Sequence, residues 1–282
     1  MIGSAARKLG HGVSGVDGFE LGDSRRARWA LSGFGIVLLI SFWQAVTTVM
    51  DLNPKYFPGP MSVVTELVRI WPAIVAALPN TLTAALVGYL LALALSLLVA
   101  MPLVASQRVL NALMPFIIGT NTVPRIAMTP LVIYWVSFYD TSALYLANYV
   151  MAAWVAFFPM LIAAIDGFRS IDEDTENMLE VYGATTWQEF KYVRLKKGLP
   201  FIFDGMKIGF ILAMIGAVVG EFVSGTFGIG SQAASAIGRT SIARAFSIVL
   251  VLGFISTAVV LVVYLIESRM IFWRESSIMG DE

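Results

Sequence analysis

The sequence contains no cysteine and only one histidine, His11, among its 282 residues. The absence of cysteine excludes a disulfide framework and a thiolate metal site. A single histidine in a glycine-rich stretch excludes a histidine-cluster metal centre and histidine-based acid–base catalysis. The remaining candidate for a metal site is one acidic run: Asp172, Glu173, Asp174, Glu176 and Glu180. The preference of carboxylates for helix starts and solvated loops explains this run without a metal. We therefore expect neither a bound metal nor a catalytic centre.

Charged residues are also scarce, at 13% of the chain, and they balance to a formal net charge of zero. A soluble domain carries about a quarter charged residues. Here 58% of the residues are hydrophobic and the mean hydropathy is +0.79. This composition predicts a membrane protein with several spans. The balanced charge gives no sign of nucleic-acid binding. The hydrophobic composition makes a lipid bilayer the expected surroundings of the chain.

Long apolar runs predict the spans, because a bilayer core takes about 20 apolar residues per helix. Six runs are long enough, and two of them contain one charge each, Arg125 or Glu221: 29–50, 82–105, 109–138, 141–165, 208–238 and 245–266. We therefore predict an all-α membrane protein with six transmembrane helices. Residues 55–78 carry apolar side chains at helical spacing after Pro58 and Pro60, which predicts a separate short helix on the membrane surface.

The distribution of lysine and arginine predicts the orientation. With the N-terminus inside, 14 of these residues lie on the cytoplasmic side and 4 lie outside, so both termini are expected inside. Residues 1–28 are interpreted as a disordered cytoplasmic tail, 29–270 as the transmembrane domain and 271–282 as a cytoplasmic C-terminal tail. The first apolar run lacks a small-residue cleavage site, which favours a retained helix over a signal peptide.

A charged segment interrupts the apolar chain after the fourth predicted span, at about residues 172–200, and ends "ENMLEVYGATTWQEFKYVRLKKGLP". Gly183 suits a left-handed helix end. Thr185 with Gln188, or Thr186 with Glu189, has the spacing of a capping box for a second helix. The pattern predicts an amphipathic helix–turn–helix, too polar to insert, before the fifth span. Physical reasoning alone leaves two functions open: docking onto another protein, or resting on lipid headgroups.

The same segment resembles the cytoplasmic signature of permease subunits in binding-protein-dependent type I ABC importers. The residues that match in register are Gly183, Ala184, Trp187, Phe190, Leu195, Leu199 and Pro200. The Glu-Ala-Ala triplet of that family falls here on residues 177–179, which are Asn-Met-Leu, flanked by Glu176 and Glu180. A second proline common in the family is replaced by Lys196.

Three further stretches resemble the nitrate/sulfonate/taurine branch of these permeases: "YFPGPMSVVTEL", "NTVPRIAMTPLVIYWVSF" and "VVGEFVSGTFGIGSQ". In the second stretch Val136 and Ser137 replace the Phe-Gly of the branch. The resemblance covers residues 55–270 approximately, and it specifies the superfamily more closely than the substrate.

The resemblance implies a non-catalytic subunit of the bacterial inner membrane that forms the path for a small anionic or polar solute. The implied partners are two ATP-binding subunits, a second copy of the permease in a homodimer, and an extracytoplasmic solute-binding protein. The chain has no phosphate-binding Gly-x-x-x-x-Gly-Lys-Ser/Thr stretch, so ATP and Mg²⁺ are expected on the ATPase partner and no cofactor in this chain. The implied coupling helix lies between the fourth and fifth spans, with these ATPase contacts: Glu176, Glu180, Tyr182, Gly183, Ala184, Thr185 and Trp187.

Four residues are expected along the translocation path: Asn121, Arg125, Glu221 and Ser224. A charge within the bilayer is costly, so Arg125 and Glu221 are expected to face protein or water. Three alternatives are open: the two pair with each other, Arg125 attracts an anionic solute, or one of them reaches an interface. Glycine pairs 205/209 and 216/220 predict close helix contacts, and a fifth helix near a two-fold axis.

Two other classes of protein are weighed against a permease subunit. A secondary transporter or channel that works alone would explain the charges within the spans but leaves the charged segment without a role. A membrane enzyme is disfavoured because no nucleophile–base set is found.

Overall fold

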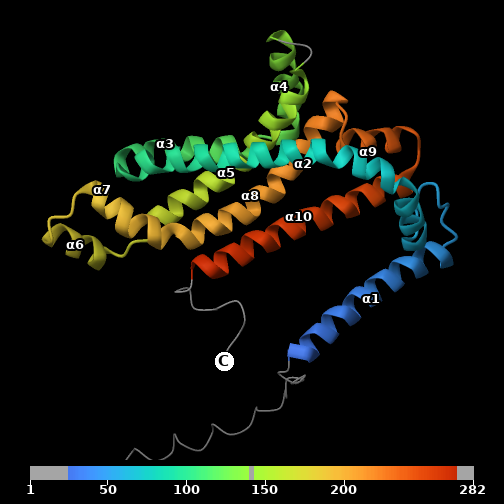
Figure 1. Cartoon of the computed structure of the whole chain (residues 1–282), viewed down its shortest axis with the longest axis horizontal. Coiled ribbons are helices and arrows are strands. Elements are labelled where there is room, and N and C mark those ends of the chain that lie inside the picture. Colours follow the sequence, from blue (N-terminus) through green and yellow to red (C-terminus); the bar gives the residue numbers. More distant parts are fainter. Residues whose placement is uncertain (1–24, 140–142, 272–282) are drawn as a thin grey trace, which may run out of the picture.

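The computed structural model describes residues 25–139 and 143–271, and within these ranges the regular elements are all helical. In chain order they are α1 (Arg25–Val49), α2 (Pro60–Val104), α3 (Gln107–Thr122), α4 (Arg125–Tyr139), α5 (Tyr145–Phe168), α6 (Glu173–Val181), α7 (Thr186–Glu189), the π-helical turn η2 (Phe190–Arg194), α8 (Leu195–Ser224), α9 (Ile229–Gly238) and α10 (Ile242–Met270). Figure 1 shows the long helices lying side by side, with α6 and α7 at one end of the bundle.

Five helical stretches are long and apolar enough to cross a membrane: Ala30–Val49, Pro60–Val104, Tyr145–Phe168, Thr186–Ser224 and Ile242–Met270. A sixth crossing exists only if α3 and the helix after it count as one span. The predicted all-helical membrane fold is therefore confirmed with five or six candidate spans.

The third predicted span, 109–138, is not one helix, because α3 and α4 meet at an angle of 93°. Val123 ends α3 in an extended conformation, with φ −60° and ψ 132°. A proline disfavours the helical conformation of the residue before it, and Pro124 follows here. The two helices together are apolar enough to count as one span, so composition alone did not reveal this break.

The predicted surface helix at 55–78 is also wrong as a separate element, since α2 runs without interruption from Pro60 to Val104. Its first turns lie at an angle to the rest of the helix (Figure 1). Ile70 and Ile74 of this stretch are buried against Ile229 and Ile248 of α9 and α10. The apolar stripe therefore packs on protein, which explains why it does not form an element of its own on the lipid surface.

The fifth predicted span, 208–238, has different bounds at both ends. Gly225, with φ +70°, ends α8 by closing its last turn in the left-handed region, and α9 follows as a separate helix. At the other end α8 begins at Leu195, so Pro200 lies inside the helix and does not precede it. The helical stretch continues back through η2 to Thr186.

The core lies where α2, α5 and α8 pack through small residues. The predicted close contacts of the glycine pairs are confirmed, because the four glycines of the two pairs all face α5: Gly205, Gly209, Gly216 and Gly220. A Cβ atom added to Gly216 would lie 2.6 Å from the Met151 carbonyl oxygen, so only glycine permits this approach. Since these contacts are made within one chain, the glycines give no support to a contact between two copies.

The helices α1 and α4 lie at the periphery. From Ala30 onward the side chains of α1 are mostly exposed and apolar, and a ring contact of 5.9 Å between Trp43 and Phe246 joins α1 to α10. The helix α4 projects from the bundle in Figure 1. Its aromatic side chains Tyr134, Trp135 and Phe138 are exposed. Both helices present surfaces suited to lipid.

Candidate functional site: charged segment and polar pocket

The charged segment forms the predicted helix–turn–helix. Asp172 caps α6 by accepting a hydrogen bond from the Thr175 backbone N–H at 3.1 Å. Gly183 adopts φ +66° in the turn, as predicted for a residue tolerant of the left-handed region. Of the two capping boxes that the sequence allows, the structure contains the one between Thr185 and Gln188, at the start of α7. The acidic run therefore starts a helix, and no metal-binding group of carboxylates is found in the part of the chain that the structure describes.

The tip of this segment presents apolar side chains to solvent. Tyr182 is 82% exposed and Trp187 is 63% exposed, and Val181 beside them is exposed as well. Isolated exposed apolar residues are ordinary, but several on one small polar element favour a contact with another protein. The structure places the seven predicted coupling residues together over three adjacent parts: Glu176 and Glu180 on α6, Tyr182, Gly183, Ala184 and Thr185 in the turn, and Trp187 on α7.

A cluster of ion pairs, which we call the Arg194 clamp, fixes the segment to the long helices. The Arg194 guanidinium lies 2.8 Å from Glu176 of α6, pairs with Glu189 of α7, and donates to the backbone oxygen of Phe168 at 3.1 Å. Phe168 is the last residue of α5, so one side chain joins three helices. No sequence pattern indicated this role, because Arg194 is one of several cations predicted on the cytoplasmic side.

A second pair reinforces the start of α6. Lys197 of α8 donates to the Asp172 carboxylate and to the Thr175 hydroxyl. The hydrogen bond from Lys197, together with that from Thr175, holds the pKa of Asp172 well below its usual range. Asp172 is therefore ionised at neutral pH, which is the state in which it caps the helix.

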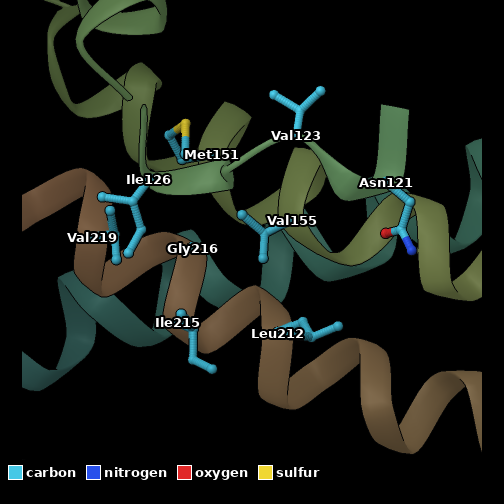
Figure 2. Close-up of a pocket in the computed structure, with 9 residues that line it drawn as sticks. All are labelled: Asn121, Val123, Ile126, Met151, Val155, Leu212, Ile215, Gly216 and Val219. Carbon is cyan, nitrogen blue, oxygen red and sulfur yellow. The ribbon is translucent and has the colours of Figure 1, made fainter. Parts of the chain in front are cut away.

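An apolar pocket of about 390 Å³ lies between the α3–α4 junction, α5 and α8. Figure 2 shows the residues that line it: Asn121, Val123, Ile126, Met151, Val155, Leu212, Ile215, Gly216 and Val219. The side-chain amide of Asn121, which is a predicted path residue, is the polar group in this lining. The side chain of Arg125 lies outside the described residues, and its neighbour Ile126 lines this pocket.

A polar pocket of similar volume, about 390 Å³, lies between α2, the first turns of α5 and the α8–α9 loop. It is lined by Asn80, Ala84, Tyr145, Asn148, Tyr149, Thr226 and Phe227. Asn148 donates to the Thr226 hydroxyl at 2.8 Å and accepts from Ser224 at 3.3 Å. The predicted path residue Ser224 is thus part of the hydrogen-bond network behind this pocket.

Glu221 lines neither pocket. It is fully buried, and one carboxylate oxygen accepts from the Thr81 hydroxyl at 2.9 Å and from the Gly230 N–H at 2.8 Å. The Thr81 hydroxyl in turn accepts from the Ile229 N–H. This group, which we call the Glu221 anchor, ties the end of α8 to α2 and to the start of α9.

The anchor bears on the predicted Arg125–Glu221 pair. Val219 faces the apolar pocket near Ile126, and Glu221 lies two residues further along α8, about 200° around the helix. The Glu221 carboxylate is directed to α2 and α9. Because the Arg125 side chain is not described, the pair itself stays a prediction.

Known proteins are similar to this chain in sequence and in fold. Residues 92–272 match the family described as "Binding-protein-dependent transport system inner membrane component". The riboflavin transport system permease protein RibX of Chloroflexus aurantiacus is 32% identical over 89% of this chain and 94% of its own. The taurine transport system permease protein TauC of Escherichia coli is 28% identical over 76% of this chain and 81% of its own.

One solved structure has a similar fold. It is described as "Crystal structure of an amino acid ABC transporter with histidines", and it matches with a TM-score of 0.57 over 73% of this chain and 96% of that chain. The sequence identity is 16%, so this likeness concerns the fold alone.

Proposed function

This chain belongs to the family of inner membrane components of binding-protein-dependent transport systems, and from that membership we propose its orientation, its contacts and its solute. It is a multi-pass permease subunit of an ABC importer in the inner membrane, and it is not the catalytic component. ATP is hydrolysed on a separate subunit, and a solute-binding protein is the other kind of partner that such a system requires. A transporter that works alone and a membrane enzyme are thereby set aside.

The proposed orientation has both termini and the charged segment 172–200 in the cytoplasm. The excess of Lys and Arg on that side supports it. The last turn of α10 contains Arg269, and in Figure 1 α10 ends toward the end of the bundle that carries α6 and α7, which supports this orientation. The division into a tail at 1–28, a transmembrane domain at 29–270 and a tail at 271–282 is part of this proposal, as is a sixth span formed by α3 and α4.

The proposed ATPase contact is the tip of the charged segment. The observation that carries it is the exposure of Tyr182 and Trp187 on an element that the Arg194 clamp joins to the end of α5. The seven coupling residues would form the surface that fits a groove of the ATPase, with the two aromatic side chains as anchors.

Co-purification tests this contact directly. Trp187→Ala should release the ATPase from the tagged permease and abolish ATP-driven uptake, while the permease still inserts into the membrane. Trp135→Ala on α4 is the matched control, because that side chain is similarly exposed, at 56%, and lies on the projecting helix. Retention of the ATPase by Trp187→Ala at the control level would refute the contact.

The proposed assembly has two copies of this chain and two ATP-binding subunits. Since the α8 glycines are used within the chain, the remaining support is the run of small and polar residues at 224–235, which suits lipid poorly. A cysteine at Ser231 should cross-link two copies in the membrane. Recovery of a second, different permease in equal amount would replace the homodimer with a heterodimer.

The proposed translocation path runs beside α8, with Asn121, Arg125, Glu221 and Ser224 near it, and carries a small polar or anionic solute. Relatives named for riboflavin and for taurine differ in solute chemistry, so family membership leaves that chemistry open. If Arg125 and Glu221 pair, Arg125→Ala and Glu221→Ala should each impair uptake, and the double variant should be milder than their sum. A silent Glu221→Ala beside an inactive Arg125→Ala would favour direct contact of Arg125 with the solute.

A further inference from the structure

The polar pocket lies at the end of the bundle opposite the charged segment. Tyr145, Asn148 and Tyr149 come from the first turns of α5, whereas α5 ends at Phe168 beside the Arg194 clamp. In the proposed orientation this is the outer half of the permease, where an external binding protein releases its solute. The pocket is therefore placed to receive a solute early in its passage.

Thr226 and Phe227 of the α8–α9 loop form the roof of the pocket, and hydrogen bonds from two asparagine side chains hold this loop in place. Asn80 donates to the backbone oxygen of Phe227 at 2.9 Å, and Asn148 donates to Thr226 at 2.8 Å. Directly behind them, the Glu221 anchor fixes the backbone at Ile229 and Gly230. A pocket whose walls are already fixed binds a ligand without the cost of ordering them.

The pocket offers no positive charge. None of the seven described residues that line it is Lys, Arg or His. The group that anchors its roof is a carboxyl, that of Glu221. Oxyanions such as nitrate or a sulfonate are bound by cations or by converging N–H donors. In this pocket each asparagine amide already donates one of its hydrogens to the α8–α9 loop. This lining is therefore poorly suited to an oxyanion.

Aromatic faces and amide edges make up the lining instead. The rings of Tyr145 and Tyr149 meet nearly at right angles with centroids 6.1 Å apart, so they present two differently oriented faces. Phe227 adds a third ring, 59% exposed, at the roof. Planar nitrogen heterocycles are recognised by stacking on such rings while amides and hydroxyls bind their polar edges.

We propose that the polar pocket is a solute subsite for an uncharged planar nitrogen heterocycle, of the flavin or pyrimidine kind, and not for an oxyanion. The proposal rests on the proposed function of the chain as a permease and adds the chemical class of its solute. Tyr149 and Phe227 stack on the ring, and Asn80 binds its polar edge.

The test is ATP-dependent uptake by the full importer, with its ATPase and binding protein, reconstituted into liposomes. Radiolabelled riboflavin and cytosine serve as heterocycle probes, and taurine and nitrate serve as oxyanion probes. Uptake of a heterocycle at least about tenfold above both oxyanions is expected. Tyr149→Leu should lower kcat/KM for that heterocycle about tenfold, because it removes a ring on which the solute stacks, whereas Tyr149→Phe keeps the ring and should change kcat/KM little.

Two further variants keep the result interpretable. Phe227→Leu removes a ring whose side chain makes no hydrogen bond, so it should assemble normally and lower uptake of the heterocycle even if Tyr149→Leu assembles poorly. Tyr134→Leu on α4, where the side chain is 66% exposed, is the matched control and should leave uptake unchanged.

The outcomes separate the two levels of the proposal. ATP-driven uptake of taurine or nitrate, with no uptake of either heterocycle, overturns the solute class. An importer that binds its ATPase but takes up neither heterocycle overturns it as well. Both outcomes leave the permease function intact. Heterocycle uptake that is unchanged in both Phe227→Leu and Tyr149→Leu overturns the subsite. Failure of the chain to hold an ATPase, with no uptake of any probe, overturns the proposed function itself.

Discussion

Replacing Arg194 by methionine is expected to uncouple ATP hydrolysis from transport, because it removes the clamp and keeps most of the side-chain volume. Three contacts are lost together: an ion pair with Glu176, an ion pair with Glu189, and a hydrogen bond to the Phe168 oxygen. The change acts on the connection between the charged segment and the spans, and not on the aromatic tip that would contact the ATPase.

The magnitude follows from the exposure of each partner. The Glu176 side chain is 48% exposed, so its pair contributes at most about 1 kcal/mol. The Glu189 side chain is 22% exposed, and a charge-assisted bond in that setting is worth about 1.5 kcal/mol. The cation at the C-terminus of α5 adds about 0.5 kcal/mol. The total of about 2–3 kcal/mol corresponds to a roughly 30- to 150-fold shift toward a detached segment.

The assay is the number of solute molecules taken up per ATP hydrolysed by the reconstituted importer. Arg194→Met should lower this ratio at least about tenfold while the ATPase still co-purifies. Arg194→Lys restores the charge but lacks the planar fork that reaches three partners, so an intermediate ratio is expected. Lys196→Met is the control, because it removes a cation two residues further along the helix at an exposed position. A normal ratio in Arg194→Met would refute this account of the clamp.

Three further predictions concern the turn, the anchor and the helix cap. Gly183→Val should leave insertion intact and abolish coupled ATPase activity, since valine strongly disfavours φ +66°; normal activity would contradict it. Gly228→Ala places a Cβ atom 2.2 Å from the buried carboxyl carbon of the anchor and should lower the Tm of the solubilised protein, whereas Gly119→Ala, with open space around it, should not. The hydrogen bond from Lys197 depresses the pKa of Asp172, so the capping contribution is present above the ordinary carboxyl pKa of about 3.9 and is lost only as pH falls further, through the folded value; coupling should therefore show no step from Asp172 near about pH 4. A step near about pH 4 that disappears in Asp172→Asn would show that the Lys197 bond is weaker than the structure indicates.

The features that the sequence predicted correctly depend on neighbours in the chain. The helix start at the acidic run, the left-handed turn at Gly183 and the capping box at Thr185 each involve residues within three positions of one another. Spans followed equally from local composition, except where one residue breaks the helix, as at Val123 before its proline.

The features that it missed depend on residues far apart. Glu221 meets Thr81 across 140 positions, and Asn80 meets Phe227 across 147. No spacing rule connects such pairs, so the sequence offers for Glu221 a pair with Arg125, the other charge within a predicted span, as one of three alternatives, and none of the three includes Thr81. The polar pocket was missed for the same reason, since its lining comes from three separate segments.

The continuous helical stretch from Thr186 to Ser224 has a mechanical consequence. At about 1.5 Å per residue, its 39 residues make a rod about 58 Å long, with Trp187 at one end and the roof of the polar pocket at the other. Tilting such a rod by about 10° about one end moves the other by about 10 Å. A small rotation of the ATPase subunits would therefore move the roof of the pocket, with the helix acting as the lever. The same rod would carry the presence of solute back to the site of ATP hydrolysis, since a coupling between two sites works in both directions.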